Sequence, residues 1–285
     1  MNRFRLMALA VSALFLQSCS PPSVGGGSTS GELADGVSAG TAPYALLELS
    51  TGTVTYRASL PDAATNPAYR FNQMVFRRVG PDGAKAFVGI FEVTQAQWST
   101  LSSIGAGLTQ PWLAIDTNVV QATAQANINP AYNIAYDELA VVLSGYAPTS
   151  RVRLMTPTSA QWEAAVGTST GYSWGATAAR SPLAAQAVVR ETVLDATTVV
   201  ARTGGSGLVD SGGPLAVGSR SPSPQGIYDI HGNVWEWTAG GTEVRGGSWY
   251  DAASLARAEV RAGAGQGLAA DVDHALIGAR LVLIP

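Results

Sequence analysis

Tryptophans in glycine-rich segments are the feature that most constrains how this chain can fold. Five of them lie between residues 162 and 249: Trp162, Trp174, Trp235, Trp237 and Trp249. Each is a large apolar body whose indole N–H needs an acceptor once it is buried. The nearby Gly232, Gly246 and Gly247 permit positive φ or a close approach of two backbones. We therefore expect a fold in which buried tryptophans hold irregular segments together.

Residues 1–18 have the pattern of an export signal. A short basic region precedes an uncharged apolar run over residues 6–16, which is too short to span a membrane as a helix. A bulky apolar residue at Leu16 and a small residue at Ser18 then precede Cys19, as in bacterial lipoprotein signals. We predict cleavage before Cys19 and lipidation of its thiol, with a further acyl chain on the new N-terminus giving stable anchoring. The alternative is an ordinary signal peptide with an incidental cysteine.

The residues after the cysteine predict where the folded part is displayed. Ser20, in place of aspartate, favours the outer membrane if the host has two membranes. Residues 19–43 are rich in Gly, Ser and Pro, a composition typical of a flexible tether. We therefore expect a protein of the cell envelope that contacts the membrane through its lipid anchor, with the folded part held off the bilayer.

Composition excludes several classes of function. The net charge is −3 and no run of Lys or Arg occurs, so no nucleic-acid partner is expected. Charged residues make up 13% of the chain against a usual quarter, so the surface is expected to be rich in uncharged polar residues. Cys19 is the single cysteine, which leaves the folded part without a disulfide, a thiolate metal site or a thiol redox site.

The remaining residues predict an α+β fold with a small twisted antiparallel sheet, about three helices and much loop. The expected elements are a hairpin over 45–57, strands over 74–79 and 86–93, and helices over 94–101, 134–144 and 158–166. Thr94 and Thr158 each precede a glutamine by three residues, the spacing of a capping box. Residues 167–220 lack periodicity and are predicted to be mostly loop. We divide this part into an N-terminal β add-on over 44–71 and a main domain over 72–285.

Several motifs follow one another along the main domain. They are FEVTQAQW (91–98), YNIAYDEL (132–139), RLMTPTSAQWEAA (153–165), YSWG (172–175), QGIYDIHGNVWEW (225–237), RGGSW (245–249) and IGARL (277–281). In this order they resemble the formylglycine-generating enzyme, or sulfatase-modifying factor, family. The resemblance implies the C-type-lectin-like fold of that family. Within it, Arg245 and Arg280 are expected to pair with carboxylates or carbonyls at sheet ends.

The activity of that family requires residues that this chain lacks. The resemblance implies a copper oxidase with two thiolates just after the RGGS segment, since soft thiolates hold Cu(I). Here residues 249–254 are WYDAAS and contain no sulfur. We therefore expect no copper site and no formylglycine-generating activity. The two histidines, His231 and His274, are expected to be turn or surface residues rather than metal ligands.

A structural calcium ion is the one metal that the resemblance implies. Its ligands would be the side chains of Asp229 and Glu236 and the carbonyls of Gly232 and Val234. Carboxylates and carbonyls are the ligands that calcium prefers. The alternative is that the two carboxylates cap the turn or pair with arginine.

Two classes of function remain. In the first, the loops around 103–130, 167–222 and 250–276 form one recognition face for an extracellular protein or carbohydrate. The residues expected to face the ligand are Tyr250, Asp251, Ser254, Asp273 and His274. A special case is the variable, ligand-binding protein of a diversity-generating retroelement, because residues 250–276 consist mostly of types that adenine mutagenesis of asparagine codons yields.

The second class is an enzyme of the wider family with unrecognised chemistry. Its candidate groups are Tyr250, Asp251, Arg257 and Glu259. They form no nucleophile–base pair at a recognisable spacing. We therefore favour a non-catalytic binding module.

Overall fold

The computed structural model describes most of the chain from residue 37 onward. The described residues are 37–80, 87–105, 107, 109–114, 128–146, 148, 150–193, 213–262, 269–271 and 273–285. They belong to one unit that begins at Leu33. The predicted signal peptide, Cys19 and most of the tether lie outside the described residues. No helix in the described part is long and apolar enough to cross a membrane.

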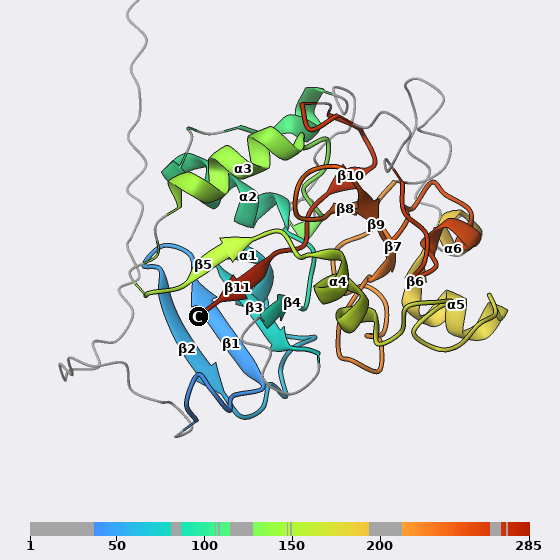
Figure 1. Cartoon of the computed structure of the whole chain (residues 1–285), viewed down its shortest axis with the longest axis horizontal. Coiled ribbons are helices and arrows are strands. Elements are labelled where there is room, and N and C mark those ends of the chain that lie inside the picture. The colour runs from blue at the N-terminus through green and yellow to red at the C-terminus, as the bar shows by residue number, and fades with distance from the viewer. Residues whose placement is uncertain are drawn as a thin grey trace, which may run out of the picture. The chain divides into compact units, whose positions relative to one another are not determined.

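A six-stranded antiparallel sheet forms the centre of the fold (Figure 1). In spatial order its strands are β2 (Thr53–Arg57), β1 (Tyr44–Glu48), β3 (Gln73–Arg78), β4 (Phe87–Gly89), β11 (Val282–Ile284) and β5 (Arg153–Met155). The predicted hairpin and first strand are confirmed. The strand predicted over 86–93 ends at Gly89. The Ile90 N–H still donates to Val75 of β3, but the Ile90 carbonyl accepts the Tyr228 N–H and the Val93 N–H donates to the Ala279 carbonyl.

The N-terminal residues are part of this same sheet. β1 pairs along its whole length with β3, so residues 44–57 extend the sheet of the main domain. Pro43 also accepts a hydrogen bond from the backbone N–H of Arg78, and Ala42 is buried. The end of the predicted tether is therefore packed against β3.

Side chains of the sheet enter two apolar cores, because successive residues of a strand point to opposite faces. One face carries Leu47, Met74, Phe76, Phe87 and Leu283. The opposite face carries Leu46, Val75, Val88 and Val282. Both faces therefore need a cover, and helices supply it.

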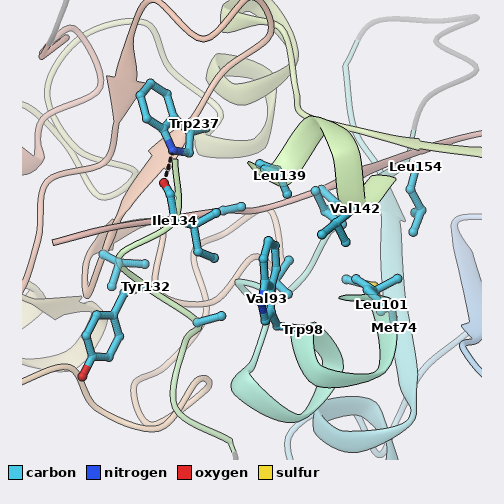
Figure 2. Packing of buried hydrophobic residues seen from close by; sticks show 14 of the residues in the cluster. Met74, Val93, Trp98, Leu101, Tyr132, Ile134, Leu139, Val142, Leu154 and Trp237 are labelled. Carbon is cyan, nitrogen blue, oxygen red and sulfur yellow. Dashed lines mark hydrogen bonds between the residues drawn. The ribbon is translucent and has the colours of Figure 1, made fainter. Parts of the chain in front are cut away.

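Two helices cover the first face. α2 (Gln95–Gly105) and α3 (Tyr136–Gly145) pack against each other beside the sheet (Figure 1). Figure 2 shows their apolar side chains converging on one core, which also contains Leu154 of β5. The capping box of α2 is confirmed, with the N–H of Gln97 donating to Thr94 Oγ1 at 3.1 Å and the N–H of Thr94 to Gln97 Oε1 at 3.0 Å.

The opposite face is covered by α4 (Ser159–Val166) and α1 (Ala68–Phe71). The predicted helix over 158–166 is confirmed, with Thr158 and Gln161 forming the capping box. Gly167 ends it in the left-handed conformation with φ of 85°. Such a C-terminal glycine is the common stop signal of a helix.

Three short helices differ from the sequence-based expectation. α1 was not predicted, and α5 (Arg180–Gln186) and α6 (Arg190–Val193) lie in the segment predicted as loop. Elements of about two turns or less are too short to show apolar periodicity. The α+β class and the C-type-lectin-like arrangement are confirmed, with six α-helices among the described residues rather than three.

Smaller sheets carry the glycine-rich motifs. Their strands are β10 (Ile277–Gly278), β8 (Trp235–Trp237) and β9 (Val244–Arg245) in one sheet, and β6 (Ala187–Val188) and β7 (His231–Gly232) in another. Gly232 has φ of 93°, and a Cβ there would lie 2.0 Å from the carbonyl oxygen of Val188. No other residue type fits this close approach of two backbones.

Four tryptophans of these motifs bond to distant or turn segments. The acceptors are Glu236 Oε2 for Trp162 at 2.7 Å, the Thr177 carbonyl for Trp174 at 3.1 Å, Asp251 Oδ2 for Trp235 at 2.7 Å and the Ile134 carbonyl for Trp237 at 2.7 Å. Figure 2 shows the bond between Trp237 and Ile134. The predicted role of tryptophan as an anchor of irregular segments is confirmed at these positions.

Candidate functional site

A buried arginine–carboxylate pair holds several segments of the chain together. Nε of Arg280 donates to both oxygens of Glu236 at 3.0 and 3.1 Å, and its Nη2 donates to Oε1 at 2.7 Å. The remaining guanidinium N–H groups reach the carbonyls of Gly89 and Tyr228. Glu236 Oε2 also accepts the indole N–H of Trp162. The expected pairing of Arg280 is confirmed, and it takes up both oxygens of Glu236.

Glu92 adds a second carboxylate to this buried region. Its Oε2 accepts from Asn233 Nδ2 at 2.5 Å, and its Oε1 accepts from the backbone N–H of Val234 at 3.1 Å. Burial raises the pKa of Glu92 well above its ordinary value, and the negative charges of Asp229 and Glu236 raise it further. The low-dielectric surroundings therefore favour the neutral acid.

Asp229 is the third buried acid, and it is held in an unusual backbone conformation. Its φ is 54°, and its Oδ2 accepts the backbone N–H of Gly218 at 2.5 Å. Its Oδ1 is buried without a hydrogen-bond partner in the described structure. Burial raises the pKa of Asp229 to about 6, although the Gly218 hydrogen bond and the nearby Arg280 and Arg70 lower it. This carboxyl group is thus strained, desolvated and only half satisfied.

Of the residues predicted to hold calcium, Glu236 is already engaged by other groups of the chain. Both oxygens of Glu236 are engaged by Arg280 and Trp162, so a cation already lies against this carboxylate. A second cation there would meet the guanidinium charge. The alternative, in which a carboxylate pairs with arginine, is met at Glu236. Oδ1 of Asp229 has no hydrogen-bond partner in the described structure.

Asp251, predicted to face a ligand, is half-buried and bonds to the scaffold through one carboxylate oxygen. Its Oδ2 accepts from the Trp235 indole at 2.7 Å and from Ser248 Oγ at 2.5 Å. Its carbonyl accepts the backbone N–H of Arg190 at 2.9 Å. A carboxylate with these partners has a structural role.

Tyr250, beside Asp251, is the part of this segment that faces outward. It is 38% exposed, and its ring lies edge-on to Trp249 with the centroids 5.6 Å apart. Trp249 itself is buried in the first core. The backbone N–H of Trp249 is also bonded to the Asn233 carbonyl. The exposed ring of Tyr250 therefore follows directly after a residue, Trp249, that is held in place by burial and a backbone hydrogen bond.

The other predicted ligand-facing residues are exposed as well. Ser254 lies beside exposed Leu255 on the 3-10 helix Ala253–Ala256. Asp273 accepts from Asn133 Nδ2 at 3.4 Å, and His274 Nδ1 accepts the backbone N–H of Leu276 at 3.2 Å.

Trp235 connects two of these segments. Its backbone N–H donates to the carbonyl of Leu276 at 2.8 Å, while its indole donates to Asp251. The segment of His274 and the segment of Tyr250 therefore meet at Trp235. Among the described residues, no hydrogen bond joins Ser254 to the other predicted ligand-facing positions.

His231 is not a surface or turn residue, which corrects the sequence-based expectation. It is fully buried on β7, where Nδ1 donates to the Ala256 carbonyl at 2.7 Å and Nε2 accepts the backbone N–H of Ser173 at 3.0 Å. The rings of Tyr172 and Trp174 lie edge-on to it. Burial lowers the pKa of His231 to about 4, so the imidazole is neutral near pH 7.

The charged candidates of the enzyme hypothesis are also engaged. Arg257 and Glu259 form an ion pair of 2.8 Å, and Glu259 Oε2 accepts the backbone N–H of Gly171 at 2.6 Å. These contacts leave Tyr250 as the enzyme candidate with an exposed functional group and no hydrogen bond from its side chain in the described structure.

Sequence reasoning missed Glu92 and Asn233 as members of the buried cluster. The available signal for Glu92 is its position in the otherwise apolar run over residues 86–93, since a lone acid there is rarely buried without a partner. For Asn233 the signal is weaker. Its φ of 63° is one that asparagine tolerates better than most residues.

The curled antiparallel sheet, its covering helices and the tryptophan-anchored motifs define a C-type-lectin-like protein. Residues 84–283 match the family described as "Sulfatase-modifying factor enzyme 1-like domain", and the chain belongs to this family. A search of the curated proteins found no match.

Three solved structures are similar to the chain. Treponema denticola variable protein 1 has a TM-score of 0.50 at 18% identity and covers 75% of this chain and 96% of its own. CarF has a TM-score of 0.42 at 19% identity, covering 69% and 85%. PvdO from Pseudomonas aeruginosa has a TM-score of 0.47 at 15% identity, covering 80% and 89%. At these identities the likeness to the Treponema protein shows a shared fold.

Proposed function

We propose that this chain is a non-catalytic binding module, displayed from the cell envelope through a lipid on Cys19. The observation that carries the proposal is the segment 249–254, where the family resemblance places the two copper-binding thiolates. This segment contains no sulfur. Asp251 in this segment accepts hydrogen bonds from the Trp235 indole and the Ser248 hydroxyl. The side chains of this segment that face outward are those of Tyr250 and Ser254.

A rigid scaffold with an exposed tyrosine supports recognition rather than turnover. Tyrosine gives a large contact area with a polar end at a low cost in conformational entropy. Its neighbour Trp249 is buried, so the backbone that carries Tyr250 is held in place. The side chains of Ser254, Asp273 and His274 are also exposed, and we propose that they belong to the same recognition surface. The ligand we propose is an extracellular protein or carbohydrate.

Binding is tested with the purified full chain on a glycan array and on a panel of extracellular proteins. We expect at least one ligand whose binding falls at least tenfold in Tyr250→Ala, as for an aromatic contact of about 1.4 kcal/mol. Val141→Ala is the matched control, because Val141 is 56% exposed on α3. Equal loss in both variants, or no specific ligand, would contradict the proposal.

Catalysis is tested directly with copper, oxygen and a sulfatase-type peptide containing the target cysteine. We expect no formylglycine in the peptide by mass spectrometry, because residues 249–254 supply no thiolate for Cu(I). Turnover by the wild-type chain would restore the enzyme hypothesis.

Anchoring is tested by replacing the lipidated residue. Cys19→Ser is expected to move the chain from the membrane fraction to the soluble fraction, since two or more acyl chains are what gives stable attachment. Separation of inner and outer membranes then checks the proposed outer-membrane location. Membrane retention of the variant would contradict the lipid anchor.

A second candidate function is suggested by one structural neighbour. The name of the Treponema denticola protein describes it as a variable protein. If residues 250–276 are varied in the same sense, a near-identical template repeat and a reverse-transcriptase gene are expected beside the gene. Genome sequencing of the locus decides this, and the absence of both would rule the candidate out.

A further inference from the structure

A pocket of about 520 Å³ lies between α3 and β5, apart from the segment 250–276. Its volume falls within the range of about 300–1,000 Å³ in which proteins hold small molecules. One wall consists of residues from α3, and the other consists of consecutive residues from 152 to 156. The pocket is therefore built on two regular elements with fixed geometry.

The lining of this pocket is mostly apolar. Leu139 and Leu154 are buried at its base, and Figure 2 shows both in the first core. Leu143 is half-buried, and Met155 is 41% exposed. Apolar surface left open to water in this way favours a ligand that covers it with hydrocarbon.

A single charged residue stands in the lining. Among the described lining residues only Arg153 carries a charge, and no acid lines the pocket. Arg153 and Met155 are both exposed and both line the pocket, on the strand β5 at the edge of the sheet. A cation thus stands next to the exposed apolar wall.

Arg153 differs from the structural arginines of this fold. Arg245 is bonded to Glu163 and Glu243, and Arg280 to Glu236. Arg153 makes no hydrogen bond or ion pair with a described residue and is exposed. An exposed guanidinium with five free donors in a fixed fork is suited to a carboxylate.

We propose that this pocket binds an amphipathic anion, with its hydrocarbon tail between α3 and β5 and its carboxylate on Arg153. A monomeric ligand of this kind matches a concave apolar site with one cation at its wall. The same chemistry exists in anionic lipids of a bilayer, and the experiment separates the two sources. The site is independent of the binding surface proposed around Tyr250.

The test measures binding of dodecanoate, below its micelle concentration, to the full chain carrying Cys19→Ser. Isothermal titration is run in parallel with dodecanol and with dodecyltrimethylammonium, which have the same tail without the negative charge. We expect dodecanoate to bind at one site and at least tenfold more tightly than either control, as for one charge-assisted contact.

Matched variants assign the site. Arg153→Gln is expected to weaken dodecanoate binding about tenfold, whereas Arg151→Gln, a neighbouring exposed arginine outside the pocket, is expected to leave it unchanged. Ala140→Trp places a bulky ring in the pocket from an exposed helix position and is expected to abolish binding of the tail.

Several results would overturn the proposal. They are equal binding of the ammonium and carboxylate probes, equal effects of Arg153→Gln and Arg151→Gln, and unchanged binding in a folded Ala140→Trp variant. Binding to vesicles that contain phosphatidylglycerol, without binding of monomeric dodecanoate, would also overturn it and would assign Arg153 to a bilayer surface.

Discussion

Arg280 shows how a single residue can hold a fold with few regular elements. It is fully buried and bonds to Glu236, Gly89 and Tyr228, which lie on three different segments. Removing one partner of a buried pair leaves the other charge unpaired in a medium of low dielectric. The cost of leaving one charge buried and unpaired is therefore larger than the net stabilisation that the attraction within the pair provides.

Arg280→Gln is expected to lower the free energy of unfolding by about 3–5 kcal/mol, because Glu236 would be left buried without its cation. Arg257→Gln is the control. Its ion pair with Glu259 is about one-third exposed, and its loss is expected to cost about 0–1 kcal/mol. Urea unfolding of the three proteins measures both values. Similar losses in the two variants would contradict the buried-pair argument.

His231 makes the free energy of unfolding depend on pH. The pKa of His231 is lowered by burial to about 4 in the folded state, against 6.5 in an unfolded chain. The unfolded state therefore binds a proton first as the pH falls. The stability that neutral His231 contributes is present above pH 6.5 and is lost as the pH falls toward 4, by about 3 kcal/mol in total.

The test compares wild type with His231→Asn, whose amide retains a donor toward the Ala256 carbonyl. Asp229 titrates in the same range with the opposite sign, so the difference between the two proteins is the quantity to follow. The advantage of the wild type is expected to shrink between pH 6.5 and 4 in urea unfolding. An advantage that stays constant with pH would show that His231 is not held neutral.

The role of a single residue was predictable from sequence where its side chain needs one type of hydrogen-bond or ion-pair partner when buried. Arg280 in a terminal motif and tryptophans with one N–H each have few ways to be satisfied when buried. The partner of Asp251 was not predictable, because an acid in a polar segment fits both a ligand surface and a scaffold bond. His231 shows the same ambiguity, since a histidine beside a glycine turn gives no sign of its burial.

At the scale of elements, capping explains why the helices α2 and α4 begin where they do. Thr94 and Thr158 both accept a hydrogen bond from a glutamine N–H three residues on. Thr94 is buried, and its hydroxyl also donates to the Arg70 carbonyl at 2.7 Å. Thr158 is exposed. The two caps therefore have different surroundings and the same local geometry.

Thr158→Ala is expected to cost about 1 kcal/mol, the usual value for a lost N-cap. Thr94→Ala is expected to cost about 1–3 kcal/mol more, because the buried Arg70 carbonyl also loses a donor. Urea unfolding of the two variants gives the comparison. A smaller effect at Thr94 than at Thr158 would show that the buried bond contributes nothing.

Elements with a start signal and several apolar turns were predictable, and shorter ones were not. The helix over 158–166 carries both its cap and its stop glycine in the sequence. α6 has four residues, which are too few for a repeating apolar pattern to be recognised in the sequence. The strand β4 stops early because distant backbone groups compete for residues 90–93, and local sequence does not report such competition.

For the whole molecule, the question of a calcium ion is open to a direct measurement. Because Arg280 already neutralises Glu236, added calcium or a chelator is expected to leave the thermal midpoint unchanged. Differential scanning calorimetry with calcium and with EGTA measures this. A stabilisation by calcium that disappears in Asp229→Asn would instead establish the ion at the loop over 229–236.

The order of motifs predicted the whole fold better than any element did. Several motifs between residues 91 and 281 are bonded to one another, as Trp162 is to Glu236 and Trp237 is to the Ile134 carbonyl. The predicted site was less well specified. The exposure of Tyr250 and the hydrogen bonds of Asp251 depend on how Trp235 and Trp249 pack, which needs three-dimensional information.

The position of β11 in the sheet has a consequence for when the fold can form during synthesis. Val282–Ile284 lie between β4 and β5, whose residues are separated from them by more than a hundred positions. A ribosome delivers a chain from its N-terminal side. Until residue 284 has emerged, β4 and β5 have no strand between them. The six-stranded sheet is therefore expected to close only after residue 284 has left the ribosome.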